Sequence, residues 1–251
     1  MSYLHFLIPP QKGIPILLFH QILPKDPSVM NTPPELFESY LSFLKGEGYQ
    51  PVSLSQLGKI VTGEIPKLER AIYFTFDDGY LSQIKYAYPL LRKYGFKGSV
   101  YIIGDKLKEK SDEQTGDEEH QYADCSDLRN LDPEVMEIGL HSTTHSPFSK
   151  LSSKDMENEI LKNISLCNKF KLPFLPYFAY PYGSRPGSKK QLNEMKTIFK
   201  NIGLKAAFRV GNSVQKLPVK DLYEIKRIHI SGFDTIDNLK IKLKRGKLKP
   251  F

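Results

Sequence analysis

The sequence alternates between short apolar segments and longer amphipathic segments along most of its 251 residues. The apolar segments are rich in β-branched and aromatic residues, and the amphipathic segments place apolar residues at helical spacing. A strand followed by a helix, repeated about seven times, predicts an α/β fold with a mostly parallel sheet. The number of repeats and the chain length favour a barrel over an open doubly wound sheet.

The expected elements form one domain over the whole chain, residues 1–251. This domain has a polar insertion at about 105–133, which is rich in Asp, Glu, Lys and Gln. The expected strands are residues 14–19, 50–54, 71–78, 99–103, 136–140, 176–180, 205–210 and 222–230. The expected helices are residues 36–44, 55–61, 82–94, 152–170, 188–202 and 234–244.

The composition limits the location and the partners of the chain. No apolar run reaches 18 residues, so no membrane span is expected. Residues 1–10 lack a basic region followed by a long apolar core, which predicts no signal peptide and a cytoplasmic location, or a periplasmic or extracellular one if a signal peptide was removed. The net charge of +8 and the basic tail at 240–249 allow peripheral contact with an anionic membrane, although a solvated helix end is the simpler interpretation. No nucleic-acid motif is present.

Polar side chains follow the apolar run of several expected strands. His20 follows the first, Asp77 and Asp78 end the run that begins at Ala71, and His141 follows the segment 136–140. In parallel α/β folds the carboxyl ends of all strands face the same side, where active sites form. These residues are therefore expected to meet in space despite their separation in sequence.

Three of these residues form a candidate metal site. His141 and His145 are four residues apart, and on a helical turn they would lie on one face and could bind one ion. With Asp78 they give two imidazoles and one carboxylate, a set that suits Zn²⁺, or Co²⁺, Ni²⁺ or Fe²⁺. Three protein ligands leave a coordination position for water, which is typical of a catalytic metal.

Three short motifs resemble those of the polysaccharide deacetylases, the NodB-homology domain of carbohydrate esterase family 4. They are Thr75–Gly79 (TFDDG), His141–His145 (HSTTH) and Tyr180–Gly183 (YPYG). The similarity extends over about residues 14–245, except for the polar insertion at about 105–133, and it is greatest to the subgroup that deacetylates poly-N-acetylglucosamine in biofilms. The resemblance implies a distorted (β/α) barrel with about seven parallel strands.

The resemblance also implies an activity, which is hydrolysis of the N-acetyl group of an amino sugar in a poly- or oligosaccharide. It implies Asp78, His141 and His145 as metal ligands and Asp77 as the general base. A backbone N–H near Tyr182 would help to hold the oxyanion. The alternatives are a deacetylase acting on a lipid- or nucleotide-linked sugar or another small amide, and a catalytically weak homologue that binds glycans.

The general acid is the first point at which the sequence departs from the family pattern. Most members carry their acid histidine in a Leu-x-Ile-x-x-His motif near the C-terminus, which this chain lacks. In the biofilm subgroup the histidine of the opening strand takes that role, which points to His20. His229, at the end of the last strand, is the alternative.

The arginine that normally orients the catalytic aspartate is the second departure. The family has it two residues before the proline of the third motif, where this chain has Ala179. Arg227 or Arg209 could reach the site from a neighbouring strand, and Arg227 is the preferred candidate. Tyr180 and Tyr182 could stack on a sugar face, or they could be buried packing residues.

Overall fold

The computed structural model of the chain describes residues 13–109 and 121–246. Its strands are β1 (Ile16–Phe19), β2 (Gln50–Pro51), β3 (Ala71–Phe76), β4 (Gly98–Ile102), β5 (Met136–Leu140), β6 (Phe174–Ala179), β7 (Ala206–Val210) and β8 (Ile225–His229). Its α-helices are α1 (Pro34–Gly46), α2 (Leu54–Thr62), α3 (Tyr88–Tyr94), α4 (Cys125–Arg129), α5 (Ser153–Lys169), α6 (Lys189–Ile202) and α7 (Ile236–Arg245). A π-helical turn, η2 (Gln83–Ala87), leads into α3.

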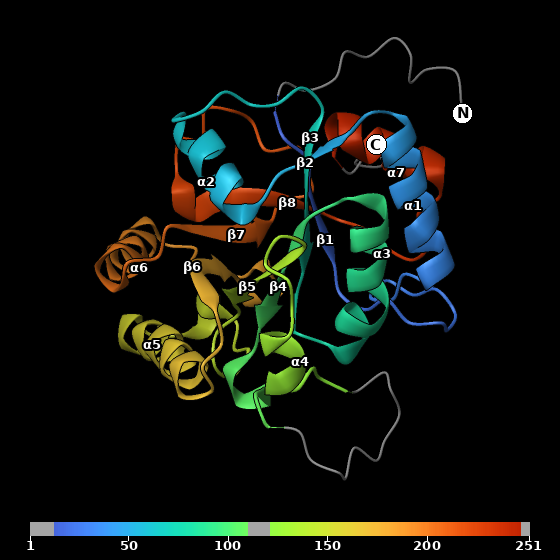
Figure 1. The fold of residues 1–251 in the computed structure, drawn as a ribbon. Helices are drawn as coiled ribbons and strands as arrows, with labels where there is room; N and C mark the ends of the chain where they lie inside the picture. Colours follow the sequence, from blue (N-terminus) through green and yellow to red (C-terminus); the bar gives the residue numbers. More distant parts are fainter. Residues whose placement is uncertain (1–12, 110–120, 247–251) are drawn as a thin grey trace.

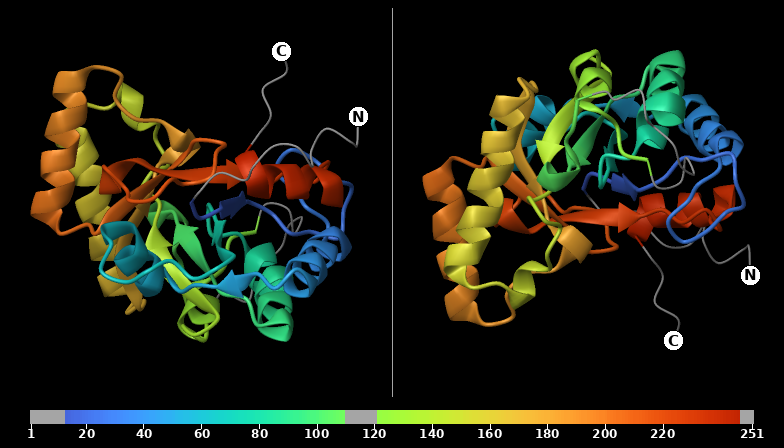
Figure 2. Two further views of the ribbon diagram at one scale, coloured as in Figure 1. Left: turned by 90° about the horizontal axis from the view of Figure 1, so that it is seen from above. Right: turned by 90° about the horizontal axis from the view of Figure 1, so that it is seen from below.

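Seven of the strands close into a barrel. The order around the sheet is β1-β8-β7-β6-β5-β4-β3, and β1 also pairs with β3, so that the two ends of the sheet meet. Every pairing is parallel, and the two-residue strand β2 extends the sheet beside β3. Helices surround the strands, with α1, α3 and α7 on one side and α5 and α6 on the other (Figures 1 and 2). The predicted (β/α) barrel of about seven parallel strands is confirmed.

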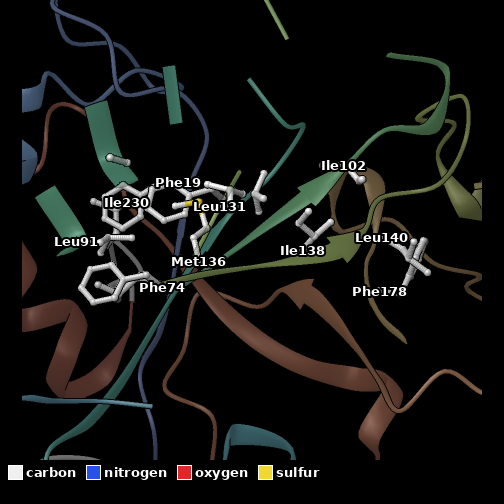
Figure 3. Packing of buried hydrophobic residues seen from close by; sticks show 14 of the residues in the cluster. Phe19, Phe74, Leu91, Ile102, Leu131, Met136, Ile138, Leu140, Phe178 and Ile230 are labelled. Carbon is white, nitrogen blue, oxygen red and sulfur yellow. The ribbon is translucent and has the colours of Figure 1, made fainter. Parts of the chain in front are cut away.

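Alternating residues along each strand face two different environments. On β3, Phe74 and Phe76 join a large apolar cluster with residues of α1 and α3, whereas Tyr73 joins a second cluster that includes residues of α2. Neighbouring side chains on a strand point to opposite faces of the sheet, so one set packs under the outer helices and the other fills the barrel. Figure 3 shows part of the outer cluster, with Phe19 and Phe74 near Leu91 of α3 and with β4 and β5 side by side.

Several expected strands are longer than the observed ones, most clearly 50–54, 71–78 and 222–230, because the chain turns or a helix begins at their ends. β3 ends at Phe76, and Asp78 has a φ of 77°, a left-handed conformation that a strand cannot continue through. Residues 222–224 form a 3₁₀ turn before β8 begins. The turn after β3 matters for the site because it separates the directions of the side chains of Asp77 and Asp78.

The polar insertion is partly ordered structure. In residues 121–133, α4 begins at the capping box of Asp124 and Asp127 and buries Cys125 and Leu128. Tyr122 forms an antiparallel bridge with Tyr80, next to the turn after β3. The expectation of a solvated segment is therefore wrong for residues 121–133, because its few apolar side chains are the buried ones; residues 110–120 lie outside the described residues.

The described helices are all too short or too polar to cross a membrane, as the lack of a long apolar run predicted. Part of the predicted basic tail lies on α7, where Lys240 and Lys242 form ion pairs with Asp237 and Asp234. The rest of that tail, residues 247–249, lies outside the described residues.

Candidate metal centre and active site

Three side chains with metal-binding atoms converge at the carboxyl ends of β3 and β5. Nε2 of His141 lies 3.4 Å from Oδ1 of Asp78, and Nε2 of His145 lies 3.2 Å from the same oxygen. One ligand atom from each of the three residues lies within 4.8 Å of the others. Asp78 and His141 are buried, and His145 is partly exposed. The structure thus brings together the three residues that the sequence suggested as metal ligands.

The loop that carries the two histidines is not the helical turn that their spacing suggested. Ser142 and His145 both have positive φ angles, 63° and 62°, so the rings converge through a tight irregular loop. Helix α5 fixes this loop from outside, because a carboxylate oxygen of Glu159 accepts hydrogen bonds from the backbone N–H groups of Thr143 and Thr144, each at 2.9 Å. The two imidazoles therefore converge without a helical turn, because these bonds hold the loop in a different conformation.

The geometry at Asp78 fits a cation. Oδ1 of Asp78 is buried without a hydrogen-bond donor among the described residues, although it faces the two imidazoles. Nδ1 of His141 lies 2.7 Å from the carbonyl oxygen of Ala179. A hydrogen bond donated by Nδ1 leaves the lone pair of Nε2 directed at Asp78. The carboxylate of Asp78 and the Nε2 lone pair of His141 are then two acceptors that face each other. A cation such as Zn²⁺, Co²⁺, Ni²⁺ or Fe²⁺ can bind between them.

Asp77 is held by a buried arginine from β8, which is separated from β3 by β1 alone. Arg227, on β8, donates two hydrogen bonds to the two carboxylate oxygens of Asp77, at 2.6 and 2.7 Å. Its guanidinium lies over the ring of Tyr101, 5.6 Å from the ring centre, and it is fully buried. Burial raises the pKa of Asp77, but the Arg227 guanidinium and the nearby histidines outweigh it and lower that pKa, so the carboxylate is ionised at neutral pH.

The second arginine candidate points elsewhere. Arg209 pairs with Glu224, with Nε 2.9 Å from a carboxylate oxygen, and Arg185 pairs with the same glutamate. β7 and β8 are neighbours, and Arg209 and Arg227 occupy adjacent but different register positions. Of the two arginines that the sequence proposed, the structure therefore places only Arg227 against Asp77.

Two histidines flank this carboxylate on the side of β1 and β8. The rings of His20 and His229 are 5.6 Å apart, and Nδ1 of His20 is buried with no hydrogen-bond partner in the described parts of the chain. Burial lowers the pKa of His20, although Asp77 and Asp78 act in the opposite direction. The structure brings both candidate acids to the site, with His20 influenced by both carboxylates.

His229 gives a pH-dependent prediction for stability. Burial, His20 and Lys242 together lower the pKa of His229 from 6.5 to about 4, so the folded protein resists its protonation while the unfolded chain does not. The unfolded state therefore binds more protons between those values, and stability falls as the pH drops from 6.5 through about 4. Between these pH values the free energy of unfolding of wild type should fall by about 1–3 kcal/mol more than that of the His229→Gln variant. Urea unfolding of both proteins at several pH values measures the difference. An identical pH dependence in both proteins would contradict the shift.

Gln83 is a buried residue of the site that the sequence did not indicate. Its side-chain amide donates to the backbone carbonyl oxygens of His20, at 2.7 Å, and Asp77, at 2.5 Å. It thereby ties the end of β1 to the end of β3. Gln83 lies on the π-helical turn, which the sequence predicted as an ordinary helix, and nothing in its spacing distinguishes it from a surface residue.

The two tyrosines of the third motif have different environments. Tyr180 is fully buried, and its hydroxyl donates to the carbonyl oxygen of Tyr223, so its side chain cannot reach a ligand. Tyr182 has 69% of its surface exposed, and its ring centre lies 4.5 Å from that of His145. Packing is thus the correct interpretation for Tyr180, whereas Tyr182 borders the candidate metal centre.

A closed parallel barrel with acidic, basic and imidazole side chains at the carboxyl ends of its strands has the architecture of an α/β-barrel enzyme. Residues 64–207, more than half of the chain, match the family described as Polysaccharide deacetylase. The chain belongs to this family, whose members are hydrolases of the amide bond in N-acetylated sugars.

Two curated relatives share part of the sequence. The chain is 24% identical over 170 residues to YxkH of Bacillus subtilis, whose name assigns it to the polysaccharide deacetylases. It is 28% identical over 113 residues to the poly-beta-1,6-N-acetyl-D-glucosamine N-deacetylase of Escherichia coli K12. The matches cover 68% and 43% of this chain, but only 57% and 17% of the respective relatives.

Two solved structures share the fold over almost their whole length. The Streptococcus pyogenes deacetylase PplD has a TM-score of 0.76 at 19% identity, with 94% of this chain and 99% of that chain covered. IcaB from Ammonifex degensii has a TM-score of 0.75 at 18% identity, with 94% and 98% covered. At these identities the likeness supports the fold.

Proposed function

We propose that the protein is a metal-dependent N-deacetylase that hydrolyses the N-acetyl group of an amino sugar in a poly- or oligosaccharide, releasing acetate and a free amine. The observation that carries the proposal is the position of the Arg227–Asp77 pair beside the cluster of Asp78, His141 and His145. Oδ2 of Asp77 lies 3.9 Å from Nε2 of His141, so an ionised base adjoins the candidate metal ligands.

The cluster of Asp78, His141 and His145 is the proposed metal site, with Zn²⁺, Co²⁺, Ni²⁺ or Fe²⁺ as the ion. When bound, such an ion lowers the pKa of water and polarises an amide carbonyl. The carbonyl oxygen of Ala179 keeps His141 in the orientation that the site needs. The backbone N–H near Tyr182 is the proposed additional donor to the oxyanion.

Asp77 is the proposed general base. Arg227 fixes both of its oxygens, so the carboxylate enters the reaction ionised and in one orientation. It accepts a proton from the attacking water while the water oxygen bonds to the acetyl carbon. Such assistance contributes on the order of 10²–10⁴-fold to the rate.

His20 is the proposed general acid, with His229 as the alternative. When the bond between the acetyl carbon and the sugar nitrogen breaks, the nitrogen must gain a proton. A buried imidazole whose pKa is lowered releases a proton readily once it has one. His20 is preferred because Asp77 and Asp78, the two carboxylates of the site, both favour its protonated form.

The substrate class is proposed from the relatives, of which the Escherichia coli enzyme is named for poly-beta-1,6-N-acetyl-D-glucosamine. A lipid- or nucleotide-linked sugar or another small amide would use the same residues and is the alternative substrate. A catalytically weak glycan-binding homologue was suggested by the missing arginine at Ala179. Because Arg227 pairs with Asp77 in two hydrogen bonds, this suggestion loses its main support.

The location and extent of the protein remain proposals as well. We expect a cytoplasmic location, or a periplasmic or extracellular one if a signal peptide was removed, and one domain over residues 1–251. The basic tail at 240–249 is the proposed region of peripheral contact with an anionic membrane. Separation of membranes from soluble protein after cell lysis tests the location. Removal of residues 247–251 tests the tail, since loss of membrane binding with unchanged activity is its expected effect.

A panel of substrates tests the proposed function. Acetate release is measured from an N-acetyl-D-glucosamine oligomer and from a nucleotide-linked N-acetylated sugar. Ring opening of a simple cyclic amide is measured by the appearance of its free amine. We expect the oligomer to be preferred, with activity lost in a chelator and restored by Zn²⁺ or Co²⁺. Preference for the nucleotide-linked sugar or the cyclic amide would favour the alternative substrate, and glycan binding without hydrolysis of any of the three would favour a binding protein.

A further inference from the structure

A pocket opens beside the proposed acids, and nothing in the proposed reaction uses it. It has a volume of about 340 Å³ and lies at the carboxyl end of β8, between that strand and helix α7. His229 lines it and lies within ring contact of His20, so the pocket continues from the catalytic residues toward α7. A pocket of this size is large enough for a single sugar residue.

The walls of the pocket are fixed in place by the protein. Asn212 has a φ of 47°, donates its backbone N–H to the carbonyl oxygen of Arg227 and accepts the N–H of His229 with its side-chain oxygen. Lys242 donates to the carbonyl oxygen of His229 at 2.9 Å and pairs with Asp234. Because these side chains are already held in place, little of their conformational entropy is lost when a ligand binds.

The charges of the pocket compensate one another. Lys242 and Asp234 form an ion pair in which each side chain is only 12–13% exposed. His229 carries no charge at neutral pH because burial lowers its pKa to about 4. A phosphate or carboxylate therefore meets no free cation among the described lining residues, and an ammonium meets no free anion, so an uncharged polar ligand fits best.

Two amide groups offer hydrogen bonds to such a ligand. The side-chain oxygen of Asn238 accepts bonds from the N–H and the hydroxyl of Thr235, and that of Asn212 accepts the N–H of His229. Neither side-chain NH₂ group donates to another described residue, and both asparagines line the pocket beside the apolar Ile241. Amide donors next to an apolar wall suit the hydroxyl or acetamido oxygens and the CH face of a sugar.

We propose that this pocket, with the NH₂ groups of Asn212 and Asn238 as its donors, binds the sugar residue next to the one that is deacetylated. The assignment rests on the proposed function. It makes the two asparagines specificity-determining residues for chain length, because a single N-acetylated sugar would leave the pocket empty while an oligomer would fill it.

Two variants test the assignment. Asn238→Asp keeps the oxygen that caps Thr235 but removes the donor, and Asn212→Asp keeps the oxygen that accepts the N–H of His229 and tolerates the positive φ while removing the donor. Asn193→Asp, on the exposed surface of α6, is the matched control. Acetate release is measured with a β-1,6-linked N-acetyl-D-glucosamine pentamer and with the shortest fragment that wild type cleaves, and melting temperatures show that each variant is folded.

We expect each pocket variant to raise KM for the pentamer about 3- to 10-fold, the effect of one lost hydrogen bond, while kcat and the activity on the shortest fragment stay within 2-fold of wild type. Folded variants with unchanged KM for the pentamer overturn the subsite and leave the proposed function intact. A wild-type protein that releases no acetate from any N-acetylated sugar overturns the proposed function, and the subsite with it.

Discussion

The Arg227→Leu variant is expected to lose about 3–5 kcal/mol of stability and most of its activity. Its guanidinium is fully buried and forms two hydrogen bonds to Asp77, so its removal leaves a buried carboxylate without its partner. The pKa of Asp77 should then rise, because burial remains while the opposing positive charge is gone. The acid side of the pH profile for kcat/KM should move to higher pH, since the base stays protonated over a wider range.

Two comparisons separate this effect from a general loss of folding. Arg227→Lys keeps the charge but not the paired hydrogen bonds, so it should shift the pH profile less than Arg227→Leu does. Arg209→Leu removes an arginine whose partner, Glu224, keeps a second ion pair with Arg185, so it should cost less stability than Arg227→Leu and leave the pH profile unchanged. Urea unfolding and the pH profile are measured for all three. A folded Arg227→Leu protein with the wild-type pH profile would show that Arg227 does not position Asp77.

Replacing Asp77 with asparagine is expected to lower kcat by about 10²–10⁴-fold, the contribution of a general base. The amide has nearly the same shape and can still accept a hydrogen bond from Arg227, so the fold should persist. Asp78, His141 and His145 are unchanged, and bound metal should therefore remain at the wild-type level. The measurements are acetate release and metal analysis on the same preparation.

The matched control is Asp237→Asn, at the exposed start of α7, where the same chemical change should leave kcat unaltered. If Asp77→Asn retained more than a tenth of the wild-type kcat with its metal in place, another group would have to accept the proton. Loss of the metal together with the activity would instead indicate that Asp77 belongs to the metal site.

The fold could be predicted from the sequence because its signals are local and repeated. Most barrel strands are apolar runs that need burial on both faces, and most are followed by an amphipathic segment, although β8 also carries Lys226 and Arg227. The carboxyl-end positions of His20, Asp77 and His141 follow from parallel pairing alone, which the closed barrel confirms. Boundaries were less accurate where a turn interrupts an apolar run, as at Asp78 and before β8.

Details of the site depend on contacts between distant segments, which no local pattern records. The histidine loop follows the hydrogen bonds that Glu159 makes from α5, not the helical spacing of its own residues. Gln83 is buried because two strand ends meet over it. Helix α4 did carry a local signal, the capping box of Asp124 and Asp127, but the polar composition around it obscured the buried Cys125.

Metal analysis of the purified protein, beside acetate release from an N-acetyl-D-glucosamine oligomer, tests the central claim most directly. We predict one metal ion per chain and acetate release in wild type, and the loss of both in His141→Ala, because Asp78 and His145 alone bind an ion weakly. Metal without acetate release would keep the site and redirect the search to another amide. A protein that binds no metal even after addition of Zn²⁺, or that releases acetate at full rate without metal, would contradict the account.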